Sequence, residues 1–386
     1  PQAPIKPEGE RVGSNGILLS WKMPPPPDQS IHVFVIRYKE MCPHPDSTFT
    51  EVTNMLDNPE TLLNTLSPGA TYNIKVAAVN SAGVGPFSQS LYFKTAEAPP
   101  GMVTNLTAYA QNHSTVVLTW SLPVRINGLI TKFAVKAKHA RTGQTVRTLE
   151  LNAEEIMNGA LPHCNVRLHS APHNYMDAAD FLSRGTPSPS ITSVTSALPA
   201  LTMSPIPPAS IWNVPITVRM DKLRPYTAYV FEVSAFTSDG EGQIASTMVR
   251  MPEAAPEDSP QNLSVYNFTS KSLFLSWESP AIITGRYSYV VQIYGPAGLI
   301  SENSTSEQTI IYTGLTPFTH YRIVVMAKSA GATGPAAETR ISTPSEAPSA
   351  VSYLQAEAVD STSVLLTWGI PYQPNGLITH YRILVL

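Results

Sequence analysis

The sequence has little cysteine, little charge and no long apolar run. Two cysteines in 386 residues exclude a disulfide-dense secreted scaffold. Charged residues make up 14% of the chain and the formal net charge is −3, so the chain offers no basic stripe to nucleic acid. No stretch reaches the roughly 18 apolar residues that a membrane-spanning helix needs. We therefore expect globular domains that insert into no membrane and bind no nucleic acid.

What the sequence does have is one strand pattern that occurs four times. In each copy, apolar residues alternate along a short segment that ends in a tryptophan, at Trp21, Trp120, Trp277 and Trp368. An aromatic residue follows each tryptophan by 12 or 13 positions, in a second apolar segment. Alternation with a period of two indicates a strand with one buried face. The repeats therefore predict similar β-sandwich modules, each with its tryptophan in the core.

Three copies also share a turn of the form Leu-x-Pro-x-Thr-x-Tyr, or a close relative, at residues 66–72, 223–229 and 315–321. The tyrosines that end these turns, Tyr72, Tyr229 and Tyr321, each begin another alternating segment. In two-sheet sandwiches, a tyrosine at this corner returns its hydroxyl to the backbone a few residues upstream. We predict three such tyrosine corners, with the tyrosines in the cores.

The order and spacing of these Trp, Pro and Tyr residues closely resemble the fibronectin type III family over nearly the whole chain. The resemblance implies an all-β fold of tandem sandwiches in an extended rod, joined by linkers that contain proline. We expect modules at 1–97, 98–254 and 255–344, and a truncated fourth at 345–386 with only its first three strands. The immunoglobulin fold is a poorer match, because its domains usually carry a cysteine pair between their sheets.

The second module is longer than the others. Trp277 follows Trp120 by 157 residues, whereas Trp120 follows Trp21 by only 99. We place the extra residues in an irregular insertion at approximately 141–212, with short helices expected at 152–158 and 175–184. Residues 186–210 are rich in Ser, Thr and Pro and carry no charge, which is typical of a flexible segment. A specific binding loop is the alternative for this insertion.

Five Asn-x-Ser/Thr sequons are candidate glycosylation sites, at Asn105, Asn112, Asn262, Asn267 and Asn303. Asn105 and Asn262 both lie 15 residues before the tryptophan of their module. The leucine that follows each of them is expected to point inward, which would leave the asparagine facing outward. We therefore expect glycosylation at these two first. A polar outward position on a strand explains the same pattern without a glycan.

The sequence offers no catalytic constellation. Cys164 lies among His163, His169 and His173, but the second cysteine of a zinc site is missing nearby, so we predict no metal and no cofactor. The His-Cys pair is also not followed by the arginine that a tyrosine-phosphatase loop requires, since that position is Ser170. The sequence leaves open whether Cys164 is free or pairs with Cys42.

The usual contact loops of this fold fall at 80–86, 238–242 and 329–335. They contain no Arg-Gly-Asp, and their glycines are typical of tight turns. Stretches 262–269 (NLSVYNFT) and 294–299 (YGPAGL) resemble the ectodomains of receptor-type tyrosine phosphatases, particularly the Q type. The resemblance implies a non-catalytic, extracellular binding and spacer segment of a single-pass cell-surface protein, with protein or matrix partners. The phosphatase domain would lie elsewhere in the parent. The alternative is an adhesion or scaffold string without an enzyme domain: usherin-like, sidekick-like or of the intracellular muscle type.

Overall fold

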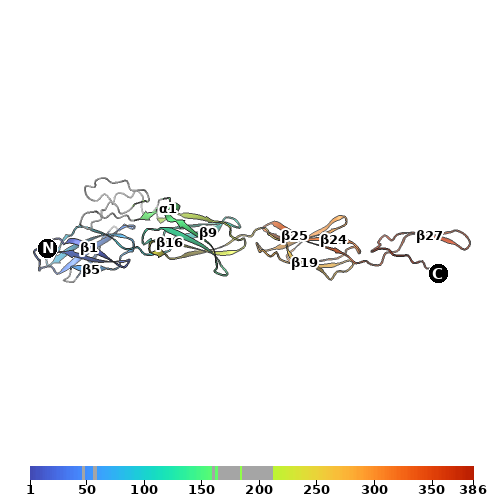
Figure 1. The fold of residues 1–386 in the computed structure, drawn as a ribbon, viewed down its shortest axis with the longest axis horizontal. Coiled ribbons are helices and arrows are strands. Elements are labelled where there is room, and N and C mark those ends of the chain that lie inside the picture. Colours follow the sequence, from blue (N-terminus) through green and yellow to red (C-terminus); the bar gives the residue numbers. More distant parts are fainter. Residues whose placement is uncertain (46–47, 55–58, 159–160, 164–182, 185–211) are drawn as a thin grey trace. The chain divides into compact units, whose positions relative to one another are not determined.

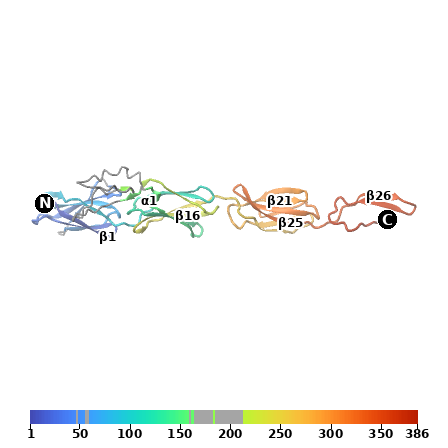
Figure 2. The same ribbon diagram turned by 45° about the horizontal axis from the view of Figure 1, so that its top comes forward.

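A computed structural model of the chain describes residues 1–45, 48–54, 59–158, 161–163, 183–184 and 212–386. Its contacts divide the chain into two compact units. Unit 1 comprises Pro1–Gln111, Thr115–Asp221 and Ala228–Val249, and unit 2 comprises Asn112–Ser114, Lys222–Thr227 and Arg250–Leu386. Nearly all of the regular structure is antiparallel β-strand (Figures 1 and 2).

The first sandwich consists of two antiparallel sheets. The smaller has the order β1-β2-β5, with bounds Ile5–Val12, Gly16–Lys22 and Glu60–Leu63. The larger has the order β4 (Thr50–Asn54), β3 (Val33–Cys42), β6 (Thr71–Asn80) and β7 (Gly83–Phe87), and β8 (Leu91–Lys94) also pairs with β6. Alternate residues of facing strands, such as Leu19 and Ile36, are fully buried between the sheets.

The second sandwich repeats this topology. Its smaller sheet has the order β15-β10-β9, with bounds Ile216–Met220, Val116–Ser121 and Thr104–Ala110. Its larger sheet has the order β12 (Thr145–Asn152), β11 (Lys132–His139), β16 (Ala228–Thr237) and β17 (Gly240–Glu241), and β18 (Ala245–Arg250) also pairs with β16. Trp120, Phe133 and Phe231 are fully buried here.

The insertion in this sandwich begins later than the sequence spacing predicts. Residues expected to open it, 145–152, form β12, which pairs with β11 along its length. The helix expected at 152–158 exists as α1, Ala153–Ile156, capped by the Asn152 side chain, which accepts a hydrogen bond from the Glu155 N–H. Two short strands, β13 (Pro162–His163) and β14 (Ser183–Arg184), pair with each other. The rest of 175–184, and all of 186–210, lie outside the described residues.

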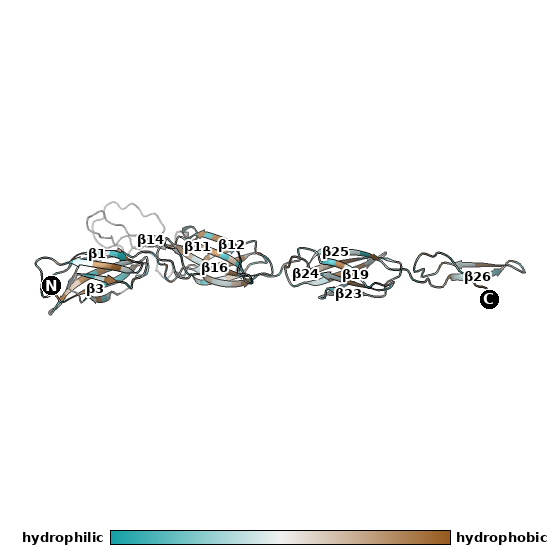
Figure 3. Ribbon diagram, turned by 60° about the horizontal axis from the view of Figure 1, so that its bottom comes forward, coloured by the Kyte–Doolittle hydropathy of each residue, from teal (hydrophilic) through white to brown (hydrophobic). Residues whose placement is uncertain are grey.

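The third sandwich has the same two-sheet plan. Its smaller sheet has the order β19-β20-β23, with bounds Gln261–Tyr266, Leu273–Glu278 and Thr309–Tyr312. Its larger sheet has the order β22-β21-β24-β25, with bounds Gly298–Thr305, Ser288–Gly295, His320–Ser329 and Ala332–Ser342. Figure 3 shows apolar stretches along the strands of this and the other sandwiches, as burial of alternate residues requires.

Residues 345–386, all of which are described, contain two strands rather than the three expected. Strands β26 (Ser352–Ala358) and β27 (Val364–Gly369) pair with each other. No strand forms after Gly369. In the complete sandwiches the third strand lies in the other sheet, between two hydrogen-bonded neighbours, as β3 lies between β4 and β6. Residues 345–386 supply no such neighbours, which explains why the third strand is missing.

Candidate glycosylation and interaction sites

Each of the four repeat tryptophans packs edge-on against the aromatic residue that follows it. The ring centroids lie 5.0 Å apart for Trp21–Phe34, 5.6 Å for Trp120–Phe133, 5.4 Å for Trp277–Tyr289 and 5.4 Å for Trp368–Tyr381. Edge-to-face contact is the arrangement that aromatic quadrupoles favour. The first three tryptophans are at most 3% exposed, whereas Trp368, on strand β27 of the two-stranded sheet, is only half-buried.

Tyrosine corners form at Tyr72 and Tyr321 through hydrogen bonds from the turn that precedes each tyrosine. The backbone N–H of Ser67 donates to the hydroxyl of Tyr72 over 2.7 Å, and Thr316 donates to Tyr321 over the same distance. Both tyrosines are buried, as is Tyr229 at the matching position of the second sandwich. Burial is the largest influence on the Tyr72 hydroxyl and raises its pKa above the ordinary value.

The sequons Asn105 and Asn262 occupy a backbone bulge that the sequence did not reveal. Both residues are exposed and have φ near +54° and +53°, and the pairing register of their strands shifts beside them. Lys6 and Tyr353 hold the same place in the other two repeats, with φ of 53° and 51°. Asparagine tolerates this left-handed conformation well, so the bulge is a second reason for asparagine at these positions. Lys6 and Tyr353 show that the bulge does not require it.

The other three sequons are also exposed. Asn112 lies in the turn between β9 and β10, where its side chain accepts a hydrogen bond from the Ser114 N–H. Asn267 follows β19 directly and has φ of 47°. Asn303 lies on β22, which pairs with β21 at the edge of its sheet. All five asparagines are therefore accessible to modification in the folded chain.

The structure explains why glycines occur in the expected contact loops. The second glycine of each loop lies against the proline that begins its own sandwich: Gly85 against Pro1, Gly242 against Pro100 and Gly334 against Pro256. A Cβ on Gly242 would lie 2.3 Å from the carbonyl oxygen of Pro100. Only glycine fits such an approach of two backbones. These glycines therefore fix the base of the loop, and the exposed residues around them remain the surface available to a partner.

The linkers are bound by backbone hydrogen bonds that sequence reasoning missed. Within unit 1, the N–H of Ala98 donates to the Asn127 carbonyl over 3.0 Å. Within unit 2, the corresponding bonds are Ala254 to Thr284 over 2.9 Å and Glu346 to Asn375 over 2.8 Å. The Asn127 and Asn375 side chains also donate to linker carbonyls. The sequence feature that could have predicted two of these bonds is the Asn-Gly pair at 127–128 and again at 375–376. All four of these residues have positive φ.

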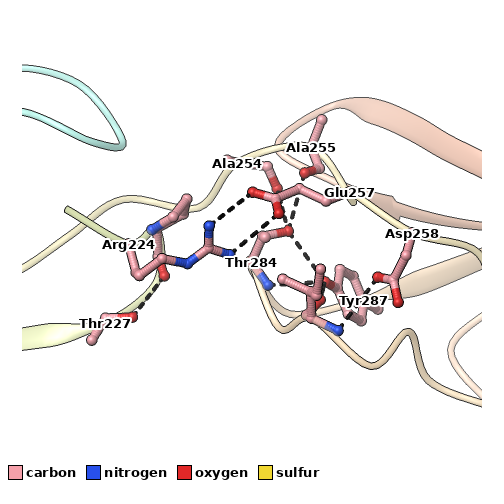
Figure 4. Close-up of polar contacts among 10 residues, drawn as sticks. Arg224, Thr227, Ala254, Ala255, Glu257, Asp258, Thr284 and Tyr287 are labelled. Atoms are coloured by element: carbon pink, nitrogen blue, oxygen red, sulfur yellow. Dashed lines mark hydrogen bonds and ion pairs between the residues drawn. The ribbon is translucent and has the colours of Figure 1, made fainter. Parts of the chain in front are cut away.

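Side chains reinforce the linker of unit 2 (Figure 4). The Thr284 hydroxyl lies 3.2 Å from the Ala254 carbonyl oxygen and 3.1 Å from that of Ala255, and donates to both. Arg224 forms an ion pair with Glu257 at 3.3 Å. Both side chains of that pair are about half exposed to solvent, so we expect the pair to contribute little to stability. The linker peptide is therefore ordered by its own local contacts.

Cys42 is fully buried at the end of β3 and takes part in a disulfide. The only other cysteine of the sequence, Cys164, lies outside the described residues, as do His169 and His173. Among the residues that the structure describes, no cluster of His, Cys, Asp and Glu could hold a metal ion. No helix in the described part of the chain is long and apolar enough to cross a membrane.

Comparison with known proteins identifies the repeated module. Residues 2–94 and 258–343 match the fibronectin type III domain. The chain is similar over 386 residues to human phosphatidylinositol phosphatase PTPRQ, at 46% identity, and over 385 residues to the rat protein, at 44%. The cell adhesion molecule Dscam1 of Drosophila melanogaster is 23% identical over 95% of the chain and 16% of its own length. The chain covers 16% of the length of each PTPRQ protein. Fibronectin type III domains therefore make up residues 2–94 and 258–343 of the chain, which spans only a small part of the length of these relatives.

Proposed function

We propose that this chain is an extracellular binding and spacer segment of a cell-surface receptor-type phosphatase. The observation that carries the proposal is similarity to PTPRQ over the entire chain, at 46% identity. The name of that relative assigns it phosphatidylinositol phosphatase activity. Because the chain spans 16% of the relative's length and contains fibronectin type III domains, we assign the catalytic activity to another part of the parent protein.

Two structural features support an extracellular location. Cys42 is in a disulfide, and disulfides persist in oxidising compartments and are rare in the cytosol. The five sequon asparagines are all exposed, as N-glycosylation requires. In this proposal Asn105, Asn112, Asn262, Asn267 and Asn303 carry glycans.

The partner in this proposal is a protein or a component of the extracellular matrix. Loops on a rigid sandwich are the usual contact surfaces of such modules. The exposed turns β6–β7, β16–β17 and β24–β25 are the surfaces we assign to it.

A second candidate is an adhesion or scaffold string without an enzyme domain. Dscam1, rat usherin and mouse sidekick-2 favour it, since each aligns with at least 95% of the chain. Their identities of 23%, 26% and 24% are far below that of PTPRQ.

The location is tested by expressing the whole chain behind a signal peptide in mammalian cells. We expect a secreted protein whose mass falls on treatment with an N-glycosidase and whose Cys42, buried in the fold, resists alkylation in denaturant until it is reduced. A protein that is secreted without glycans, with Cys42 alkylated in denaturant without prior reduction, would contradict an extracellular origin and favour the intracellular muscle-type alternative.

A further inference from the structure

An apolar row crosses the outer face of the smaller sheet of the third sandwich. Tyr266, Phe274 and Ile311 are register partners on β19, β20 and β23. The rings of Tyr266 and Phe274 lie 5.6 Å apart, and Tyr266 and Ile311 are 39% and 55% exposed. Phe268, in the turn after β19, is 48% exposed. We call these four residues the aromatic row. The core side of the same strands is formed by other residues, among them Leu273 and Leu275.

The matching rows of the other two sandwiches are interrupted by charge. In the first sandwich the partners are Glu10, Leu18 and Leu62, and in the second they are Tyr109, Val117 and Arg219. The row of the third sandwich is therefore the only one of the three that is apolar on all of its strands. It also continues into a further exposed aromatic residue, Phe268. Contiguous exposed apolar surface of this kind normally has an occupant.

The sequon of Asn267 lies within the aromatic row. Tyr266 precedes the asparagine and Phe268 is the middle residue of the sequon. The side chains of consecutive strand residues point to opposite faces of a sheet. Asn267 follows Tyr266, the last residue of β19, and has φ of 47°, so this alternation does not extend to Asn267. The ring faces of aromatic residues are electron-rich and apolar, and the C–H groups on one face of a pyranose are suited to pack on them.

We propose that Asn267 carries an N-linked glycan whose first sugar covers the aromatic row. This inference rests on the extracellular location proposed above, and it assigns that glycan a role in shielding the sheet. The other sequons of the sandwich are placed differently. Asn262 lies near the start of β19 and its side-chain amide donates to Glu278 over 2.8 Å, and Asn303 belongs to the other sheet.

The test compares three secreted full-length chains: the unchanged sequence, Asn267→Gly and the matched control Asn262→Gly. Glycine accepts the left-handed backbone of both positions, where φ is 47° and 53°, so each variant removes a sequon without backbone strain. Glycopeptide mass spectrometry reports occupancy, and hydroxyl-radical labelling reports the accessibility of Tyr266 and Phe268. Trimming to a single sugar with an endoglycosidase separates the first sugar from the rest of the glycan.

We expect Asn267 to be occupied and both aromatic residues to be protected from labelling, even after trimming to one sugar. Asn267→Gly should abolish the protection, and Asn262→Gly should leave it intact. Equal labelling of the unchanged chain and Asn267→Gly, with Asn267 occupied, would overturn the inference. So would an unoccupied Asn267 in a chain glycosylated at Asn105 or Asn262, a result that leaves the extracellular location standing. Absence of glycan from every sequon would count against both proposals. Protection in Asn267→Gly that grows with protein concentration would identify a second copy of the chain as the occupant instead.

Discussion

The hydroxyl of Tyr321 accepts a 2.7 Å hydrogen bond from the backbone N–H of Thr316, which ties strand β24 to the turn before it. Tyr321→Phe keeps the ring and leaves that partly buried N–H without its partner. We predict a loss of about 1 kcal/mol in the free energy of unfolding of the third sandwich. Chemical denaturation measures it, with Tyr109→Phe as the control, because Tyr109 is 59% exposed. Equal effects of the two variants would show that the corner bond does not stabilise the fold.

The core of the second sandwich depends on Trp120, which is fully buried against Phe133. We predict that Trp120→Ala lowers the free energy of unfolding by about 3–5 kcal/mol, because it removes the contacts and leaves a cavity. The same substitution at the half-buried Trp368 should cost less. Hydrogen exchange of β10 and β27 peptides distinguishes the two sites within one chain. A greater loss of protection in β27 than in β10 would refute this ranking.

The close approach of Gly242 to Pro100 leads to a prediction about the residue that follows β17. Gly242→Ala places a methyl group where the Pro100 carbonyl oxygen lies 2.3 Å away, and we expect a loss of about 1–3 kcal/mol. Gly85→Ala is the graded control, since its Cβ would lie 3.0 Å from the Pro1 carbonyl oxygen and should cost less. Thermal unfolding of both variants checks the order, and a larger loss at Gly85 would contradict it.

Burial of the hydroxyl raises the pKa of Tyr312 to about 12. The folded third sandwich therefore holds this phenolic proton more tightly than the unfolded chain, whose tyrosines titrate near pH 10. The resulting stability is complete below about pH 10 and is lost as the pH rises through about 12. Denaturation midpoints measured across this range should fall less steeply for Tyr312→Phe. Identical pH dependence in both proteins would refute this.

Much of the fold was predictable because period-two alternation and the Trp and Tyr spacings each report directly on burial. Trp21 and Tyr72, which share one core, are an example. The bulge at Asn105 was not, because Lys6 and Tyr353 adopt the same backbone with unrelated side chains. The linker bonds of Asn127 and Thr284 were missed because they depend on backbone atoms brought together by tertiary structure.

The boundary of the insertion was misplaced for a similar reason. Strand β12 is an edge strand with exposed alternate residues, so its apolar signal is weak. The prediction of a third strand after Gly369 was wrong for the opposite reason. Its apolar pattern is strong, but residues 345–386 offer no neighbouring strand in the sheet to which it would belong. Sequence patterns thus predicted which faces are buried better than they predicted where pairing begins and ends.

The measurement that tests the central claim most directly is sequencing of the full-length transcript that encodes this chain. A receptor-type phosphatase parent predicts a reading frame that continues from these fibronectin type III domains to a membrane-spanning segment and a phosphatase domain. A complete reading frame with such domains and no phosphatase domain would contradict the proposal and favour an adhesion or scaffold protein.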